Sequence, residues 1–231
     1  MGDFAENHEF FINLILAGVN PEFKTFLEVG TGTGMGTTRA LVNGILHRTE
    51  QNARMYSFDI NEPALHKARY QYINNRKWVS ASFLQFIWGR LNKTDFMVRE
   101  DLAEMPNPYQ IRQIYDVSYD REHHLWLKAP FVTLSEKFDV IVLDGGDFSS
   151  VGDYATLKNL EPKMWFLADV NLCKNKAAFA ELSASSKYEI VRKFEDGRGS
   201  AIFKQKGTAL IETINVDYTK FLQTPADFWL L

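Results

Sequence analysis

The chain has 231 residues, which is long enough for one domain with a sizeable core. Hydrophobic residues make up 45% and charged residues 24%, the balance of an ordinary globular protein. The formal net charge of −3 argues against bulk electrostatic attraction to nucleic acid. The single cysteine excludes an internal disulfide, the acidic first residues predict no secretory signal, and no apolar run approaches the ~18 residues of a membrane-spanning helix. We therefore expect a cytoplasmic protein without nucleic-acid or membrane partners.

Strands and helices are predicted to alternate along most of the chain. The first half is predicted to contain a helix over residues 6–16, a strand over 25–29, a helix over 37–47, a strand over 54–60, a helix over 61–75 and a strand over 83–88. The second half is predicted to contain a strand over 138–143, a helix over 151–159, a strand over 163–168, a helix over 175–186 and strands over 188–195 and 200–204. The last two strands flank Asp196-Gly197-Arg198-Gly199, a hairpin signal.

Two segments interrupt or follow this alternation. Residues 90–136 are predicted to be irregular, and so long a connection inside a compact domain is typical of a lid or another functional insertion. Residues 207–231 form a C-terminal extension with an apolar end. The alternation with a closing hairpin predicts an α/β domain over residues 1–231, with a doubly wound, mostly parallel sheet and one antiparallel strand.

The stretch Phe26-Leu27-Glu28-Val29-Gly30-Thr31-Gly32-Thr33-Gly34 is the most informative in the chain. A short apolar run with an acid leads into a turn with alternate glycines, which allow a sharp bend and a close approach to a ligand. The NAD pattern fails because its final glycine is replaced in either frame, by Met35 or Thr37. The Walker pattern fails because no lysine follows the glycines.

The remaining pattern, E-x-G-x-G-x-G, resembles motif I of the class I S-adenosylmethionine (SAM) methyltransferases, and the resemblance spans roughly residues 20–205. It implies a Rossmann-like seven-stranded sheet with an antiparallel terminal hairpin. The apolar strand Met55-Tyr56-Ser57-Phe58-Asp59 continues the likeness, because that family uses the closing acid to bind both ribose hydroxyls. The cofactor-binding residues that the resemblance implies are Glu28, Gly30, Thr31, Gly32, Gly34, Asp59 and Asp144.

Acids also follow the later predicted strands. Asp144 ends the fourth strand, and Asp169-Val170-Asn171 follow the fifth. This arrangement resembles the metal-dependent small-molecule O-methyltransferases of the catechol and macrocin types, and it implies a Mg²⁺ site of Asp144, Asp169 and Asn171. Ala168 stands where those enzymes have an acid. The alternative is that Asp144 contacts SAM or substrate while Asp169 and Asn171 cap the next helix.

Three residues are candidates for the base that deprotonates the acceptor: Asp144, Asp147 and His123, the last because a histidine in a lid has a pKa near neutrality. Residues 143–149 and 171–175 resemble bacterial methyltransferase-like proteins of polysaccharide or secondary-metabolite pathways. That likeness favours a sugar-like or polyol acceptor.

We therefore predict a SAM-dependent methyltransferase (EC 2.1.1.-) that methylates an oxygen of a small molecule. The alternative is a catalytically silent SAM-binding subunit with a regulatory or assembly role. A nucleic-acid methyltransferase is disfavoured, because Asp144-Gly145-Gly146-Asp147 replaces the N-P-P-Y type motif of amino-group DNA methylation. The sequence leaves a homo-oligomer open.

Overall fold

The computed structural model of the chain describes residues 8–48, 50, 52–74, 82–93, 112–195 and 198–210. Residues 6 and 7 of the first predicted helix, residues 94–111 of the predicted insertion, residues 196 and 197 of the predicted hairpin turn and residues 211–231 of the C-terminal extension lie outside the described residues.

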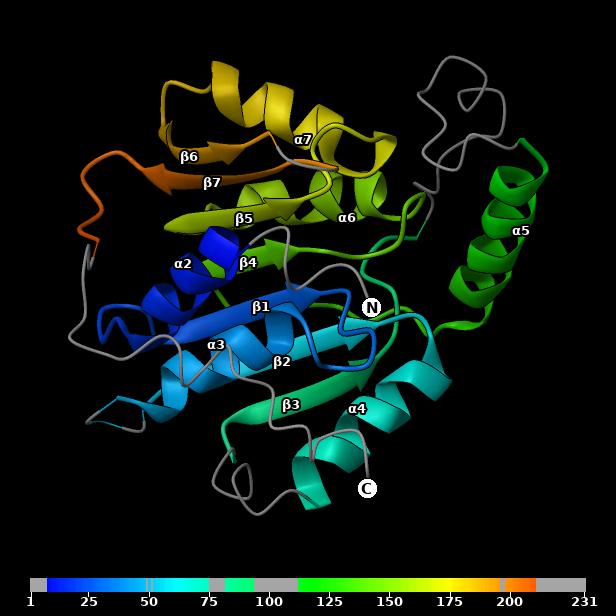
Figure 1. The fold of residues 1–231 in the computed structure, drawn as a ribbon, viewed down its shortest axis with the longest axis horizontal. Coiled ribbons are helices and arrows are strands. Elements are labelled where there is room, and N and C mark those ends of the chain that lie inside the picture. Colours follow the sequence, from blue (N-terminus) through cyan, green and yellow to red (C-terminus); the bar gives the residue numbers. More distant parts are fainter. Residues whose placement is uncertain are drawn as a thin grey trace.

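A seven-stranded sheet forms the centre of the molecule, with the strand order β3-β2-β1-β4-β5-β7-β6 (Figure 1). The strands are β1 (Thr25–Val29), β2 (Arg54–Asp59), β3 (Leu84–Trp88), β4 (Val140–Leu143), β5 (Met164–Ala168), β6 (Tyr188–Phe194) and β7 (Ser200–Gln205). Strand β7 pairs antiparallel with both β5 and β6, and the pairs formed among β1 to β5 are parallel. The predicted fold class, a mostly parallel sheet with an antiparallel terminal hairpin, is confirmed.

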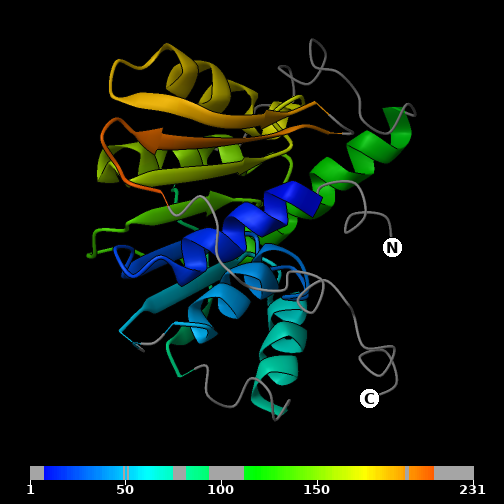
Figure 2. The ribbon, with the colours of Figure 1, turned by 60° about the vertical axis from the view of Figure 1, so that its left-hand side comes forward.

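Helices cover both faces of this sheet. They are α2 (His8–Val19), α3 (Thr37–Leu46), α4 (Glu62–Asn74), α5 (Arg112–Lys128), α6 (Ser150–Leu157) and α7 (Cys173–Ala184), with a short 3₁₀ helix, η2 (Lys158–Leu160), after α6. Side chains of α2 and α3 pack on one face, and those of α6 and α7 pack on the other (Figures 1 and 2). Within the described ranges, no helix has both the length and the apolar character needed to cross a bilayer.

The central strands read as continuous apolar runs because both of their faces are covered. All four residues of β4 are buried, and Phe26 and Phe166 on the neighbouring strands are fully buried on the α2 side. On the opposite face, Trp165 of β5 packs against Tyr154 of α6. The parallel strands therefore end together at one edge of a rigid sheet, where the glycine turn begins.

Helix α5 is the main departure from the predicted elements, since residues 112–128 were expected to be irregular. The helix has a weak apolar pattern: Tyr119 and Trp126 are buried, whereas Val117 and Leu127 are 67% and 57% exposed. A helix that buries so few apolar side chains over residues 116–128 gives little 3.6-residue periodicity for a sequence to reveal. Helix α5 stands beside the edge at which β1, β2 and β4 end (Figures 1 and 2).

Candidate cofactor site and active site

The glycine turn leaves the end of β1 in close contact with the end of β4. Gly30 has φ +101°, and a Cβ there would lie 2.0 Å from the carbonyl oxygen of Asp144. The amides of Gly30 and Thr31 donate to the carbonyl of Phe58 at 2.8 and 3.1 Å. The turn is therefore pinned between β2 and β4, and only glycine satisfies the space and the backbone conformation at position 30.

Glu28 lies beneath this turn and is fully buried. Its carboxylate accepts hydrogen bonds from the hydroxyls of Thr37, Thr38 and Ser57, so it ties the first turn of α3 to β1 and β2. Burial raises the pKa of Glu28 to about 7, although these hydroxyl bonds oppose the shift. Glu28 is not among the residues that line the cavity described below, so its position is that of a support for the turn rather than of a cofactor ligand.

Asp59 lies at the end of β2 and faces the cavity. Its carboxylate accepts the amide of Gly32 at 2.7 Å and the amide of Asn61 at 2.7 Å, which fixes both of its oxygens against the turn. Burial raises the pKa of Asp59, and these amides oppose the rise. Because each carboxylate oxygen has two acceptor sites, both remain able to accept a further hydrogen bond from a ligand.

A cavity of about 460 Å³ opens over the turn. Its floor is the glycine turn with Asp59 and Asp144, one wall is the segment after β3, and the other is helix α5. Five of the predicted cofactor residues line it: Gly30, Thr31, Gly32, Asp59 and Asp144. The predicted Gly34 lies outside the lining, with Tyr72 donating to its carbonyl at 2.7 Å.

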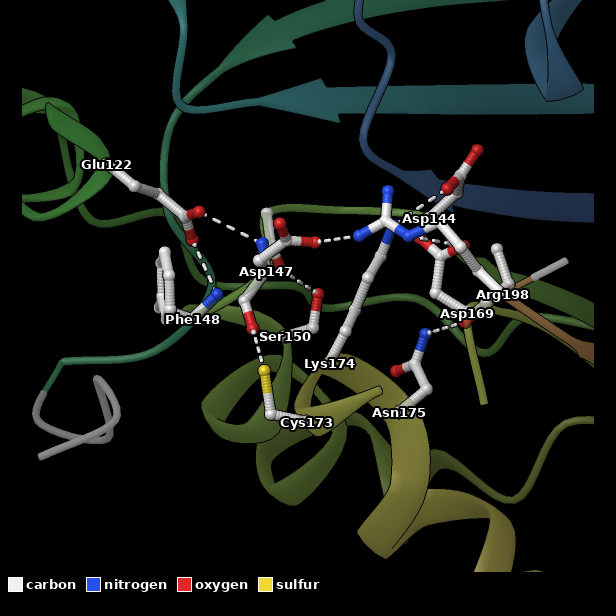
Figure 3. Close-up of polar contacts among 12 residues, drawn as sticks. Glu122, Asp144, Asp147, Phe148, Ser150, Asp169, Cys173, Lys174, Asn175 and Arg198 are labelled. Carbon is white, nitrogen blue, oxygen red and sulfur yellow. Dashed lines mark hydrogen bonds and ion pairs between the residues drawn. The ribbon is translucent and has the colours of Figure 1, made fainter. Parts of the chain in front are cut away.

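Asp144 belongs to a cluster of charged side chains at the ends of β4 and β5 (Figure 3). The Lys174 Nζ, on α7, lies 2.9 Å from Asp144 and 2.8 Å from Asp169. Burial alone would lower the pKa of Lys174, but Asp144 and Asp169 raise it above its usual value. Burial raises the pKa of Asp144, and Lys174 opposes this shift.

The predicted Mg²⁺ site does not fit this arrangement. An ammonium group lies between Asp144 and Asp169, and the described residues contain no cluster of three or more His, Cys, Asp or Glu side chains that would suit a metal. The side chain of Asn171 packs instead against Gly199, where an added Cβ would meet its Nδ2 at 2.4 Å. We therefore derive no step through a metal ion.

The alternative role for Asp169 and Asn171, as caps of the following helix, is also wrong. The N-cap of α7 is Leu172, and no side chain forms a capping hydrogen bond there. Asp169 has φ +56° and pairs with Lys174 and Arg198, so its carboxylate is committed to the charged cluster.

The other two candidate bases lie outside the cavity lining. Asp147 forms an ion pair with Arg198 at 2.7 Å (Figure 3). His123, on α5, has ring contacts with Tyr119 and Trp126, at centroid distances of 5.9 and 6.2 Å. Asp144 is thus the one of the three candidates that faces the cavity.

Two further acids, Glu122 and Asp153, shape the site and were not predicted from the sequence. Glu122 on α5 accepts the amides of residues 147, 148 and 149 at 2.8–3.0 Å, which joins α5 to the start of α6. Asp153 on α6 is buried, lines the cavity and accepts a hydrogen bond from Asn92 at 2.8 Å. Burial raises the pKa of Asp153 to about 7. One sequence signal could have indicated Asp153. Residues 150, 153 and 157 have the spacing of one helix face, and this face of α6 is buried.

Comparisons with known proteins agree with this architecture. No family model and no curated protein matches the chain. Among solved structures, it is similar to the S-adenosylhomocysteine-bound methyltransferase PaMTH1 of Podospora anserina, with 12% identity over 88% of this chain and 81% of that one, and a TM-score of 0.54. A protein of Corynebacterium glutamicum matches over 87% of this chain and 81% of its own, with 12% identity and a TM-score of 0.50. At such identities the likeness shows the fold alone, which is the Rossmann-like fold of the class I methyltransferases.

Proposed function

We propose that this chain, which has the class I methyltransferase fold, binds SAM over its glycine turn and transfers the methyl group to an oxygen of a small molecule. The observation that carries the proposal is the meeting of three groups on one cavity: the turn, the ribose-binding candidate Asp59 and the free face of Asp144. The volume of about 460 Å³ lies in the range of small-molecule and cofactor sites.

The order of the strands supports one orientation of the cofactor. Asp59 at the end of β2 would accept the ribose hydroxyls, and the turn and Asp144 would hold the methionine end on the β4 side. Strand β3 lies on the other side of β2, so residues 89–91 would contact the adenine. Asp153 lines the same cavity, and its Oδ2 offers an acceptor for the adenine amino group while its Oδ1 holds Asn92.

The acceptor occupies the part of the cavity between Asp144 and helix α5, where Ser118 and Arg121 also contribute to the lining. An oxygen lone pair attacks the methyl carbon in line with sulfur, and the C–S bond electrons remain on sulfur to give S-adenosylhomocysteine. Asp144 takes the acceptor proton, because its side chain is 31% exposed and faces the cavity. Most of the rate enhancement comes from holding the two reactants at contact distance. The side chains of Ser118 and Arg121 offer polar contacts to a hydroxylated, sugar-like or polyol acceptor.

Calorimetry with S-adenosylhomocysteine tests the cofactor half. We expect saturable binding to the wild type and none of NAD at the same concentration. Asp59→Ala removes the charged acceptor of two hydroxyls and is expected to weaken binding by roughly 10- to 100-fold. Glu189→Ala is the matched control, because it removes an exposed carboxylate from β6 at the far edge of the sheet. NAD binding in place of S-adenosylhomocysteine, or full affinity in Asp59→Ala, would refute the assignment.

A panel of sugars and polyols, with S-adenosylhomocysteine formation as the readout, tests the transfer half. Asp144→Asn is expected to lower kcat by about 100-fold or more while cofactor affinity changes by a smaller factor. Wild-type protein that binds SAM but gives no product with any acceptor would support the silent SAM-binding subunit instead. That alternative has one structural argument, because Lys174 already engages the carboxylate of Asp144.

A further inference from the structure

The ends of β4 and β5 carry a pair of acids where a divalent ion would ordinarily find oxygen ligands. Asp144 and Asp169 each contact the same nitrogen atom, the Lys174 Nζ, at 2.9 and 2.8 Å. The Lys174 side chain is only 5% exposed, so it does not leave this position for solvent without opening the cluster. The ammonium group has three donors, and two of them are used by these carboxylates.

The start of α7 fixes this lysine. Asn175, the next residue, donates from its Nδ2 to the carbonyl of Leu143 at 3.0 Å and to the carbonyl of Ala168 at 2.7 Å. These two carbonyls belong to the last residues of β4 and β5, so Asn175 links the two strand ends to the helix. Lys174 therefore enters the space between the acids on a rigid support rather than from a mobile surface position.

The remaining charges complete the cluster without an external ion. Arg198 lies 2.7 Å from Asp147 and 3.5 Å from Asp169. Two cations of the chain thus face three carboxylates. Asn171, the third ligand that a metal would need, is exposed and packs against Gly199.

We propose that Lys174 is a tethered cation that takes the place of a divalent metal between Asp144 and Asp169, so that this site binds no divalent ion until the lysine charge is removed. Lys174 is a positioning residue: it neutralises the two acids and holds Asp144 with one face toward the cavity. A divalent ion placed there would meet the ammonium charge at contact distance, and the repulsion prevents both from occupying the site.

The test is a Mn²⁺ titration followed by the electron paramagnetic resonance signal of free Mn²⁺. Wild type is expected to bind no stoichiometric Mn²⁺, and EDTA is expected to leave its melting temperature unchanged. Lys174→Ala removes the cation and leaves both acids, so it is expected to gain one Mn²⁺ site, at least about tenfold tighter than any binding by wild type. Lys174→Arg keeps a cation and is expected to gain none.

Two controls separate this site from adventitious binding. Lys176→Ala removes an exposed lysine from the same helix and is expected to behave as wild type. In the Lys174→Ala background, Asp169→Asn is expected to abolish the gained site. The proposal is overturned if wild type binds one equivalent of Mn²⁺ that Asp169→Asn removes, a measurement that does not require Lys174→Ala to fold. It is also overturned if folded Lys174→Ala gains no site. Neither outcome depends on methyl transfer, so the proposed function is tested separately.

Discussion

Two carboxylates at the glycine turn perform different tasks although they lie on neighbouring strands. Glu28 has no exposed surface and accepts three hydroxyl groups, whereas Asp59 accepts two backbone amides and faces the cavity. A carboxylate bonded only to neutral hydroxyls gains little compensation for desolvation, so burial raises the pKa of Glu28 to about 7. Glu28 therefore supports the turn, and Asp59 is the acid available to a ligand.

The raised pKa of Glu28 predicts a dependence of stability on pH. The folded-state pKa of about 7 lies above the ordinary value of 4.5 for a glutamate, so the native state binds more protons than the unfolded chain between these two pH values. The contribution of this group is therefore fully present below about pH 4.5 and is lost as the pH rises through about 7. Glu28→Gln is expected to remove that loss, about 3 kcal/mol in the free energy of unfolding at most.

Urea unfolding at several pH values between 4.5 and 8 measures this effect. Asp153, whose pKa is also raised to about 7, contributes in the same direction and remains in the variant, so the slope with pH is expected to shrink and not to vanish. Glu189→Gln, at an exposed position, is the matched control and is expected to keep the wild-type slope. An unchanged slope in Glu28→Gln would contradict the assignment.

At the scale of elements, the wall of the cavity depends on a contact between α5 and α6. Glu122 places its carboxylate just before the N-terminus of α6, where it accepts the amides of residues 147, 148 and 149. The approach is close, because a Cβ on Gly146 would lie 2.1 Å from the Glu122 Oε1. The second glycine of Asp144-Gly145-Gly146-Asp147 thus leaves the space that the Glu122 carboxylate occupies.

Replacing Glu122 by Gln is expected to weaken this contact between α5 and α6. The amide keeps one acceptor oxygen, but its NH₂ group faces an N–H donor and the charge at the helix N-terminus is lost. We expect a loss of about 1–3 kcal/mol in the free energy of unfolding, measured in urea, together with weaker S-adenosylhomocysteine binding. His124→Gln, at an exposed position two residues further along α5, is the control and is expected to change neither quantity. Equal stability of Glu122→Gln and wild type would show that this contact does not hold α5 in place.

At the scale of the whole molecule, the sheet is rigid at its centre and exposed at one edge. Strands β1 and β4 have neighbours on both sides and helices on both faces, whereas β6 ends the sheet and is buried only at its first and last residues, Tyr188 and Phe194. Local opening therefore requires the least disruption at β6. The cavity is formed by the turns that follow the central strands, so the positions of the glycine turn and Asp144 relative to each other are fixed.

Amide hydrogen exchange at neutral pH tests this gradient. Amides of β1 and β4 are expected to exchange only through global unfolding, and the amides of β6 that pair with β7 are expected to exchange at least about tenfold faster. Saturating S-adenosylhomocysteine is expected to slow amide exchange in β1 and β4 by the factor that corresponds to the free energy of binding. Exchange in β6 is expected to change less. Protection of β6 equal to that of β4 would contradict the prediction.

The sequence by itself determined most of the fold and the location of the glycine turn. Local patterns carry that information: apolar runs give the strands, turn residues such as those at 196–199 give the hairpin, and the glycines after β1 give the bend. Helix α5 was not predicted, because few apolar side chains are buried over its residues 116–128 and the sequence there has little apolar periodicity. The amino-acid types at strand ends placed Asp59 and Asp144 at one edge, where both line the cavity.

Only the tertiary structure decided what each acid does. Glu28 and Asp59 are both acids of predicted strands, but in the structure Glu28 is fully buried and Asp59 faces the cavity. Asp144 and Asp169 have the chemistry of metal ligands, yet a lysine of α7 lies between them. Ligand roles depend on which groups meet across the sheet, and such contacts join residues far apart in the chain, about which local patterns carry no information.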